Sequence, residues 1–141
     1  MATITEKQVR TIIDTALKMA RKQKLPPMAV CVVNAGGHVL GYLCEDKSAP
    51  IRFEIARGKA WTAAIRAEGT TRLAEQAARN PILVDALENV TPHYFPVRGG
   101  VLLKTAGGEA VGAVGVTGAT SEQDEACCLA GAKAARLKGS P

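Results

Sequence analysis

The amino-acid sequence predicts an α+β fold in which helices pack on one antiparallel sheet of about five strands. Two apolar segments are each divided by a glycine-rich turn, which is typical of β-hairpins, and a hairpin pairs its strands antiparallel. Segments with helical periodicity lie before, between and after these hairpins. Because no linker or repeat interrupts the 141 residues, we expect a single domain over residues 1–141.

The first helix is predicted between two clear boundary signals. Thr5 and Gln8 have the spacing of a capping box, in which each side chain bonds the other's backbone N–H. Apolar residues then recur at helical spacing from Val9 to Ala20. Pro26 and the residue after it end the helix, because proline cannot continue the ladder of hydrogen bonds.

The first hairpin and the middle helices follow in order. Two apolar runs within residues 28–46 are predicted to pair around a turn at residues 34–37. Residues 48–69 are predicted to be helical, and Gly58 costs this helix about 1 kcal/mol, which close packing against a neighbour would justify. Residues 70–90 are expected to form one or two short helices, broken at Pro81.

The second hairpin and the final helix complete the fold. The runs 97–105 and 109–118 are predicted to pair around a tight turn, and their glycines favour close packing of strands and subunits. The final helix is predicted over residues 121–138 with Ser121 as its N-cap. Negative charge is favourable in a first helical turn, so we expect Glu122, Asp124 and Glu125 to stabilise the start of this helix.

Composition narrows the class of partner. The net charge of +5 suggests an anionic ligand, yet the basic residues are dispersed, and the chain has one Trp, two Tyr and two Phe. We therefore expect a small acidic ligand rather than nucleic acid. No apolar run approaches the roughly 20 residues of a membrane span, and no secretory signal is evident, so we expect a cytoplasmic location. The four cysteines lack the spacing of metal or redox sites and are predicted to be reduced thiols.

Three segments of the sequence resemble one known family. The segments are VVNAGGHVLGYL, IARGKAWTAA and RGGVLLKTAGGEAVGAVGVTGATSEQDEACCLAG, and the likeness extends from Met28 to Gly131. They resemble the GlcG/HbpS-type family, which is related to the C-terminal domain of PduO-type proteins. The resemblance implies a profilin-like or roadblock-like sandwich that assembles into homo-oligomers. It also implies heme binding, or a role in heme or iron handling, and an association with small-molecule catabolism.

Two departures from the family pattern bear on heme binding. Asn34 stands where an aspartate is common in the first hairpin. PduO-type domains resemble this chain but use a histidine near their N-terminal region as heme ligand, and the first predicted helix here contains no histidine. That ligand therefore has no counterpart at the same place.

The segment from His93 to Gly100 concentrates residues suited to ligand binding on a loop that leads into a strand. His93 would ligate heme iron or act as a general base. Tyr94 and Phe95 would supply a flat apolar wall, and Arg98 would meet a propionate or a substrate carboxylate through two hydrogen bonds. The alternative is a connecting loop whose aromatic residues fill the core.

Glycines and a second histidine extend this candidate site. Gly99 and Gly100 form either an anion-binding nest of backbone N–H groups or a β-bulge. His38 follows the first hairpin turn and is either a ligand residue or a solvated turn residue.

The second helix supplies the opposite side of the expected cleft. Trp61 would stack on a planar ring, Lys59 would neutralise its carboxylates, and Thr62 would lie on the same side. Glu54, on the same helix, is either a catalytic group or part of a surface ion pair. The leading function is heme binding, without a further metal site. The alternative is a cofactor-independent isomerase or lyase that uses His93, Arg98 and Glu54 on a small organic acid.

Overall fold

The structure, a computed structural model, describes all residues from Met1 to Pro141. Its five strands form one antiparallel sheet in the order β2-β1-β4-β3-β5, which confirms the predicted fold class. The elements along the chain are α1 (Glu6–Lys22), β1 (Ala29–Asn34), β2 (Val39–Cys44), α2 (Arg52–Arg66), α3 (Thr70–Arg79), α4 (Pro81–Val90), β3 (Gly100–Lys104), β4 (Ala110–Thr117), α5 (Ser121–Ala134) and β5 (Lys138–Ser140).

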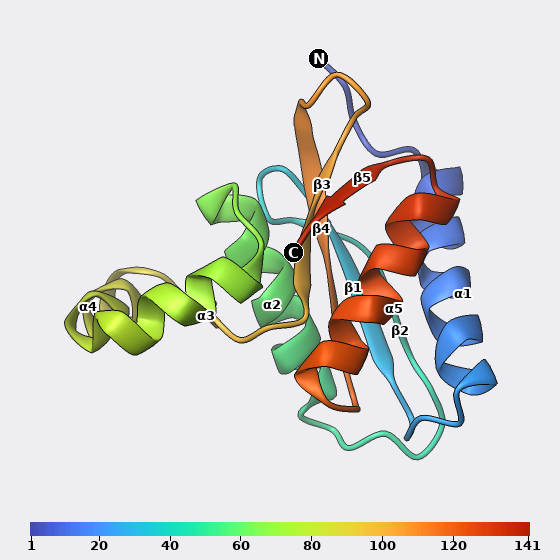
Figure 1. Cartoon of the computed structure of the whole chain (residues 1–141), viewed down its shortest axis with the longest axis horizontal. Coiled ribbons are helices and arrows are strands. Elements are labelled where there is room, and N and C mark those ends of the chain that lie inside the picture. The colour runs from blue at the N-terminus through green and yellow to red at the C-terminus, as the bar shows by residue number, and fades with distance from the viewer.

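Helices cover both faces of the sheet (Figure 1). The N-terminal helix α1 and the C-terminal helix α5 lie together on one face, over the larger apolar core. Helix α2 lies on the other face, where alanines such as Ala56, Ala60 and Ala63 form a second, thinner core. Helices α3 and α4 extend away from the body beyond α2 (Figure 1). No helix combines the length and hydrophobicity that a membrane-spanning segment needs.

The predicted start of the first helix and the break at Pro81 are confirmed, whereas α2 covers Arg52–Arg66 rather than residues 48–69 and the final helix also differs. The capping box of Thr5 and Gln8 is present, and Pro81 separates two short helices. The prediction of Ser121 as N-cap is wrong, because Thr120 caps α5 and forms a capping box with Gln123. The helix also ends at Ala134 rather than residue 138, and the last residues form β5 against β3.

Small residues bring α2 close to the sheet. A Cβ atom on Gly115 of β4 would lie 2.8 Å from the backbone nitrogen of Ala60 in α2. Gly58 faces the other side of α2, where its Cβ would lie 2.8 Å from the Cβ of Phe95. The close packing expected at Gly58 is therefore confirmed, and the small residues of β4 pack within one chain.

Candidate functional site

The loop from Thr91 to Gly99 lies across α2, and one hydroxyl group of the helix fixes it there. The Thr62 hydroxyl accepts a hydrogen bond from the Phe95 N–H at 2.7 Å and donates one to the His93 carbonyl at 3.4 Å. The absence of a side chain at Gly58 leaves room for Phe95. The structure therefore brings the predicted loop and the predicted side of the second helix together.

Trp61 lies between the loop that contains His93 and the hairpin turn that leads to His38. The His93 ring meets the indole edge-on, with ring centroids 5.7 Å apart and planes at 86°. On the hairpin side, a Cβ on Gly37 would lie 2.7 Å from Trp61 Cδ1, so the turn that leads to His38 packs on the same indole. His38 itself is exposed, whereas His93 is half-buried.

Tyr94 belongs to the packing of the loop. Its side chain is buried, and its hydroxyl accepts a hydrogen bond from Arg66 at 2.8 Å. The same guanidinium lies 5.9 Å from the ring centroid and also donates to Gln76 on α3. Tyr94 and Phe95 thus join the loop to α2 and α3, which leaves Trp61 as the aromatic surface beside His93.

Arg98 is held by carboxylates of α5. Its Nε and Nη2 atoms each donate to Glu125 at 3.0 Å, and Nη1 lies 3.4 Å from Glu122. Thr71 also donates to Glu125. Burial pushes the pKa of Glu125 upward, but the hydrogen bonds from Arg98 and Thr71 outweigh it, so this pKa lies below its ordinary value. The arginine expected to meet a ligand carboxylate is already paired within the chain.

The low pKa of Glu125 makes a prediction about acid stability. The contribution of Glu125 to stability is fully present above the unfolded-state pKa, near 4.5, and is lost as the pH falls through the lower folded-state pKa. We expect the parent protein to lose more stability than a Glu125→Gln variant between pH 6 and pH 3. Urea titrations at several pH values measure this difference, and parallel curves for the two proteins would contradict it.

Lys59 and Asp124 form a buried ion pair where the loop reaches the sheet. Lys59 Nζ lies 3.0 Å from Asp124 Oδ2 and donates to the Val116 carbonyl at 2.9 Å, and both side chains are 3% exposed. The other carboxylate oxygen of Asp124 accepts from the Ala119 N–H. Burial raises the pKa of Asp124, and Lys59 offsets only part of that rise.

Glycines make room for this ion pair. Gly99 has a φ of +117°, and a Cβ there would lie 2.8 Å from Lys59 Nζ. The next residue, Gly100, exchanges backbone hydrogen bonds with the Thr70 hydroxyl. The two glycines therefore serve the contacts between β3, α2 and α3, and no backbone nest opens toward solvent at this point.

The remaining catalytic candidate lies apart. Glu54 is exposed in the first turn of α2, and no hydrogen bond or ion pair joins it to His93 or Arg98. The structure therefore does not bring the three residues of the predicted enzyme site into contact.

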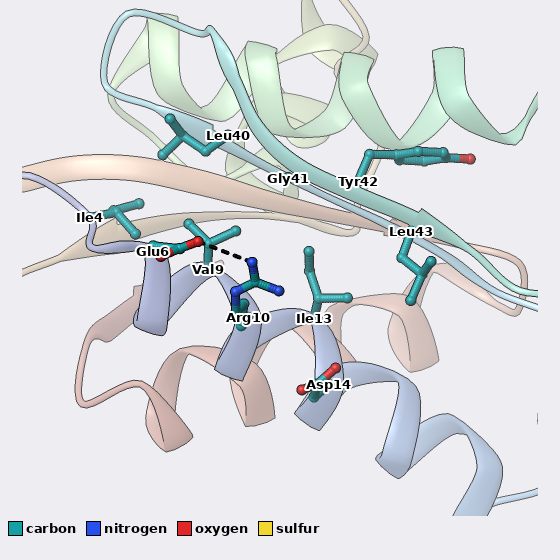
Figure 2. Close-up of a pocket in the computed structure, with 10 residues that line it drawn as sticks. All are labelled: Ile4, Glu6, Val9, Arg10, Ile13, Asp14, Leu40, Gly41, Tyr42 and Leu43. Atoms are coloured by element: carbon teal, nitrogen blue, oxygen red, sulfur yellow. Dashed lines mark hydrogen bonds and ion pairs between the residues drawn. The ribbon is translucent and has the colours of Figure 1, made fainter.

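Two hollows lie elsewhere, between α1 and the edge strand β2. The larger has a volume of about 540 Å³ and combines apolar side chains with a charged rim (Figure 2). The second, of about 490 Å³, continues along the same seam and shares Leu43 with the first. Neither contains a residue of the predicted site. The first is lined by Ile4, Glu6, Val9, Arg10, Ile13, Asp14, Leu40, Gly41, Tyr42 and Leu43.

The larger of the two hollows provides no ligand for heme iron. Tyr42 is the one residue of the usual iron-ligating types among its lining. Its ring points away from α1 and packs edge-on against Phe53 of α2, with centroids 4.8 Å apart (Figure 2). Burial is the main cause that raises the pKa of this phenol, so it stays protonated.

The chain belongs to the HbpS-like family, whose model is described as haem-degrading protein HbpS-like and matches residues 4–133. The match confirms the resemblance of the sequence. No curated protein sequence matches the chain.

Solved structures with the same fold cover almost the whole chain. The heme complex of PduOC has a TM-score of 0.88 at 20% identity, covering 99% of this chain and 100% of that one. A double mutant of HbpS from Streptomyces reticuli has a TM-score of 0.83 at 28% identity, over 94% and 87% of the two chains. The Klebsiella pneumoniae protein ORFY has a TM-score of 0.86 at 22% identity, over 96% and 92%.

Proposed function

We propose that this protein binds heme on the outer side of α2, with His93 as the iron ligand. The observation that carries the proposal is the environment of the His93 imidazole. The ring makes no hydrogen bond within the chain, is half-buried, and lies edge-on to Trp61 at 5.7 Å. A neighbouring ring orients this imidazole, and no hydrogen bond engages its nitrogen atoms. It is therefore suited to ligate heme iron. Membership of the HbpS-like family supports heme as the ligand.

Arg57 supports the same location. It lies one helical turn before Trp61, and its Nε is buried without a hydrogen-bond partner. It takes part in none of the ion pairs of the chain, and its guanidinium lies 5.0 Å from the Phe53 ring centroid. A buried polar atom without a partner is costly, and a propionate would satisfy it. Arg57 thus takes the role that the sequence suggested for Lys59 and Arg98.

Heme, when bound, would supply an iron centre, and the chain's own residues would fix its position. His93 would hold the metal, Trp61 would cover apolar ring area, and Arg57 would bind a carboxylate. The separation of Glu54, His93 and Arg98 supports ligand binding over an isomerase or lyase.

Titrations of the full chain with hemin and with metal-free protoporphyrin separate these roles. For His93→Ala we expect the Soret shift of hemin to be lost, while protoporphyrin binding is kept. For Arg57→Gln we expect roughly 10- to 100-fold weaker binding of both ligands, since a charge-assisted hydrogen bond is worth about 1.5–3 kcal/mol. His38→Ala, which changes the exposed histidine, is the matched control and should bind as the parent does. An unchanged Soret shift in His93→Ala, or its loss in His38→Ala, would contradict the proposed ligand.

We also propose that this protein is located in the cytoplasm, which is a reducing compartment. None of the four cysteines forms a disulfide, and Cys31, Cys127 and Cys128 are buried. Burial is the main cause that raises the pKa of the Cys31 thiol to about 12 and that of Cys127 to about 11. Such thiols react slowly and act as small apolar side chains. A role within small-molecule catabolism, and self-association, remain part of the proposal.

A further inference from the structure

The two edges of the sheet are protected very differently. At one edge, β5 has three residues and begins with Lys138, features that discourage pairing with another strand. At the other edge, β2 has six residues and contains neither a charge nor a proline. Its side chains are unusually open for apolar residues, with Val39 and Leu40 each 43% exposed and Leu43 47% exposed. Only β1 pairs with β2, so one row of its backbone N–H and C=O groups has no strand beside it.

A groove accompanies this open edge from Leu40 to Cys44. The two hollows of about 540 and 490 Å³ lie between β2 and α1 and share Leu43. Figure 2 shows Leu43 pointing toward the α1 side, while the neighbouring Tyr42 points to the opposite face. The edge therefore combines unpaired backbone groups with an apolar trough, as strand-addition sites do.

We propose that the β2 strand of a second copy of this chain pairs antiparallel with β2 and joins the two sheets into one. The contact is isologous, because an antiparallel pair of identical strands has a two-fold axis. It would pair the open backbone row of each copy and cover the exposed leucines of both.

The position of α1 suits this arrangement. Adjacent strands lie about 4.8 Å apart, so a two-fold axis between the two β2 strands lies about 2.4 Å beyond each. Helix α1 contacts both β1 and β2, which places it about 5 Å from that axis. The two α1 helices would then lie about 10 Å apart, within the range of packed helices. The same symmetry that pairs the strands therefore also packs the helices.

The charges along α1 are complementary to those of a second copy of α1 that runs antiparallel to it. The middle of β2 lies beside the N-terminal half of this helix, since a Cβ on Gly41 would lie 2.6 Å from Val9 and 3.1 Å from Ile13. With the axis near this point, Arg10 faces the partner's Asp14 and Asp14 faces the partner's Arg10. By the same reversal, Glu6 faces the partner's Lys18. Opposite charges across a symmetric contact favour a second copy over an unrelated extended peptide.

The mass of the protein in solution tests this contact. We expect the parent chain to run at twice the chain mass of 14.7 kDa, or an even multiple of it, in light scattering. Leu43→Lys places a charge on the open edge, at a position exposed enough to leave the fold intact, and should halve the mass with unchanged circular dichroism. Amide exchange in β2 should be slow in the parent and fast in this variant.

A charge exchange tests the register of the two helices. Arg10→Glu should weaken self-association about tenfold, and adding Asp14→Arg should restore it. The matched control is Ile82→Lys in α4, where the side chain is 81% exposed and lies away from β2. This variant should keep the parent mass.

Four outcomes would overturn the proposal. A parent chain that stays at one chain mass across micromolar concentrations leaves β2 without a second copy. An unchanged mass for Leu43→Lys shows that the copies meet elsewhere, and dissociation of Ile82→Lys in the same series assigns the contact to α4. Exchange protection of β2 that appears only with an added extended peptide assigns the edge to another protein.

Discussion

Replacing Lys59 with alanine should lower the free energy of unfolding by about 3–5 kcal/mol, the usual cost of removing one partner of a buried ion pair. Asp124 would remain 3% exposed with no cation beside it. Because burial already raises the pKa of Asp124, loss of Lys59 would drive this carboxyl further toward protonation at neutral pH. Urea unfolding followed by circular dichroism measures the loss.

A second substitution separates the charge effect from simple loss of packing. Asp124→Asn keeps an oxygen that accepts from the Ala119 N–H but removes the negative charge. The pair Lys59→Met with Asp124→Asn should therefore be more stable than Lys59→Met alone, since no unpaired charge stays buried. A double variant that is less stable than Lys59→Met would contradict a role for the buried charge. If Lys59→Ala lowered the free energy of unfolding by less than about 1 kcal/mol, the expected cost of breaking the ion pair would be wrong.

The sequence predicted the fold well because its local signals agreed with one another. Glycine-rich turns marked both hairpins, and the Thr5–Gln8 capping box marked the first helix. These features depend on residues a few positions apart, so they are visible without tertiary structure. The final helix shows the limit. Thr120 and Ser121 are both good N-caps, and only the backbone geometry decides that Thr120 has this role.

Pairings between distant residues were hidden from the sequence. The acids at the start of α5 looked sufficient as partners of the helix dipole, yet Asp124 is bound to Lys59 and Glu125 to Arg98. These contacts join residues 65 and 27 positions apart, and no spacing rule reaches that far. One signal was available: Lys59 lies among alanines on the apolar side of its helix, where an unpaired lysine would be costly.

The structure brings some of the predicted site residues together, but it pairs two of the predicted cations, Lys59 and Arg98, with carboxylates of the chain itself. Trp61, Thr62 and His93 do meet, as expected from the loop and the second helix. Arg57 was not chosen, because its unsatisfied Nε is a property of the folded structure. The groove beside β2 was missed for a similar reason: the run Val39–Cys44 is apolar whether its strand is central or at an edge, and sheet order is a tertiary property.

Replacing Gly115 with alanine should lower stability by about 3 kcal/mol or more, at the upper end of overpacking effects, because the added methyl group has no space. Its Cβ would lie 2.8 Å from the Ala60 nitrogen and closer still to the Ala56 carbonyl, and both are helix backbone that cannot rotate away. Helix α2 would have to move off β4, and Trp61 and Arg57 move with it, so hemin affinity should fall together with stability. Gly107→Ala is the matched control, since its nearest neighbour would be 3.8 Å away in a hairpin turn. Thermal unfolding and hemin titration of both variants test this prediction. Equal melting temperatures for Gly115→Ala and Gly107→Ala would show that α2 has room to adjust on the sheet. The close approach at Gly115 would then not be what positions the proposed heme-binding side of the helix.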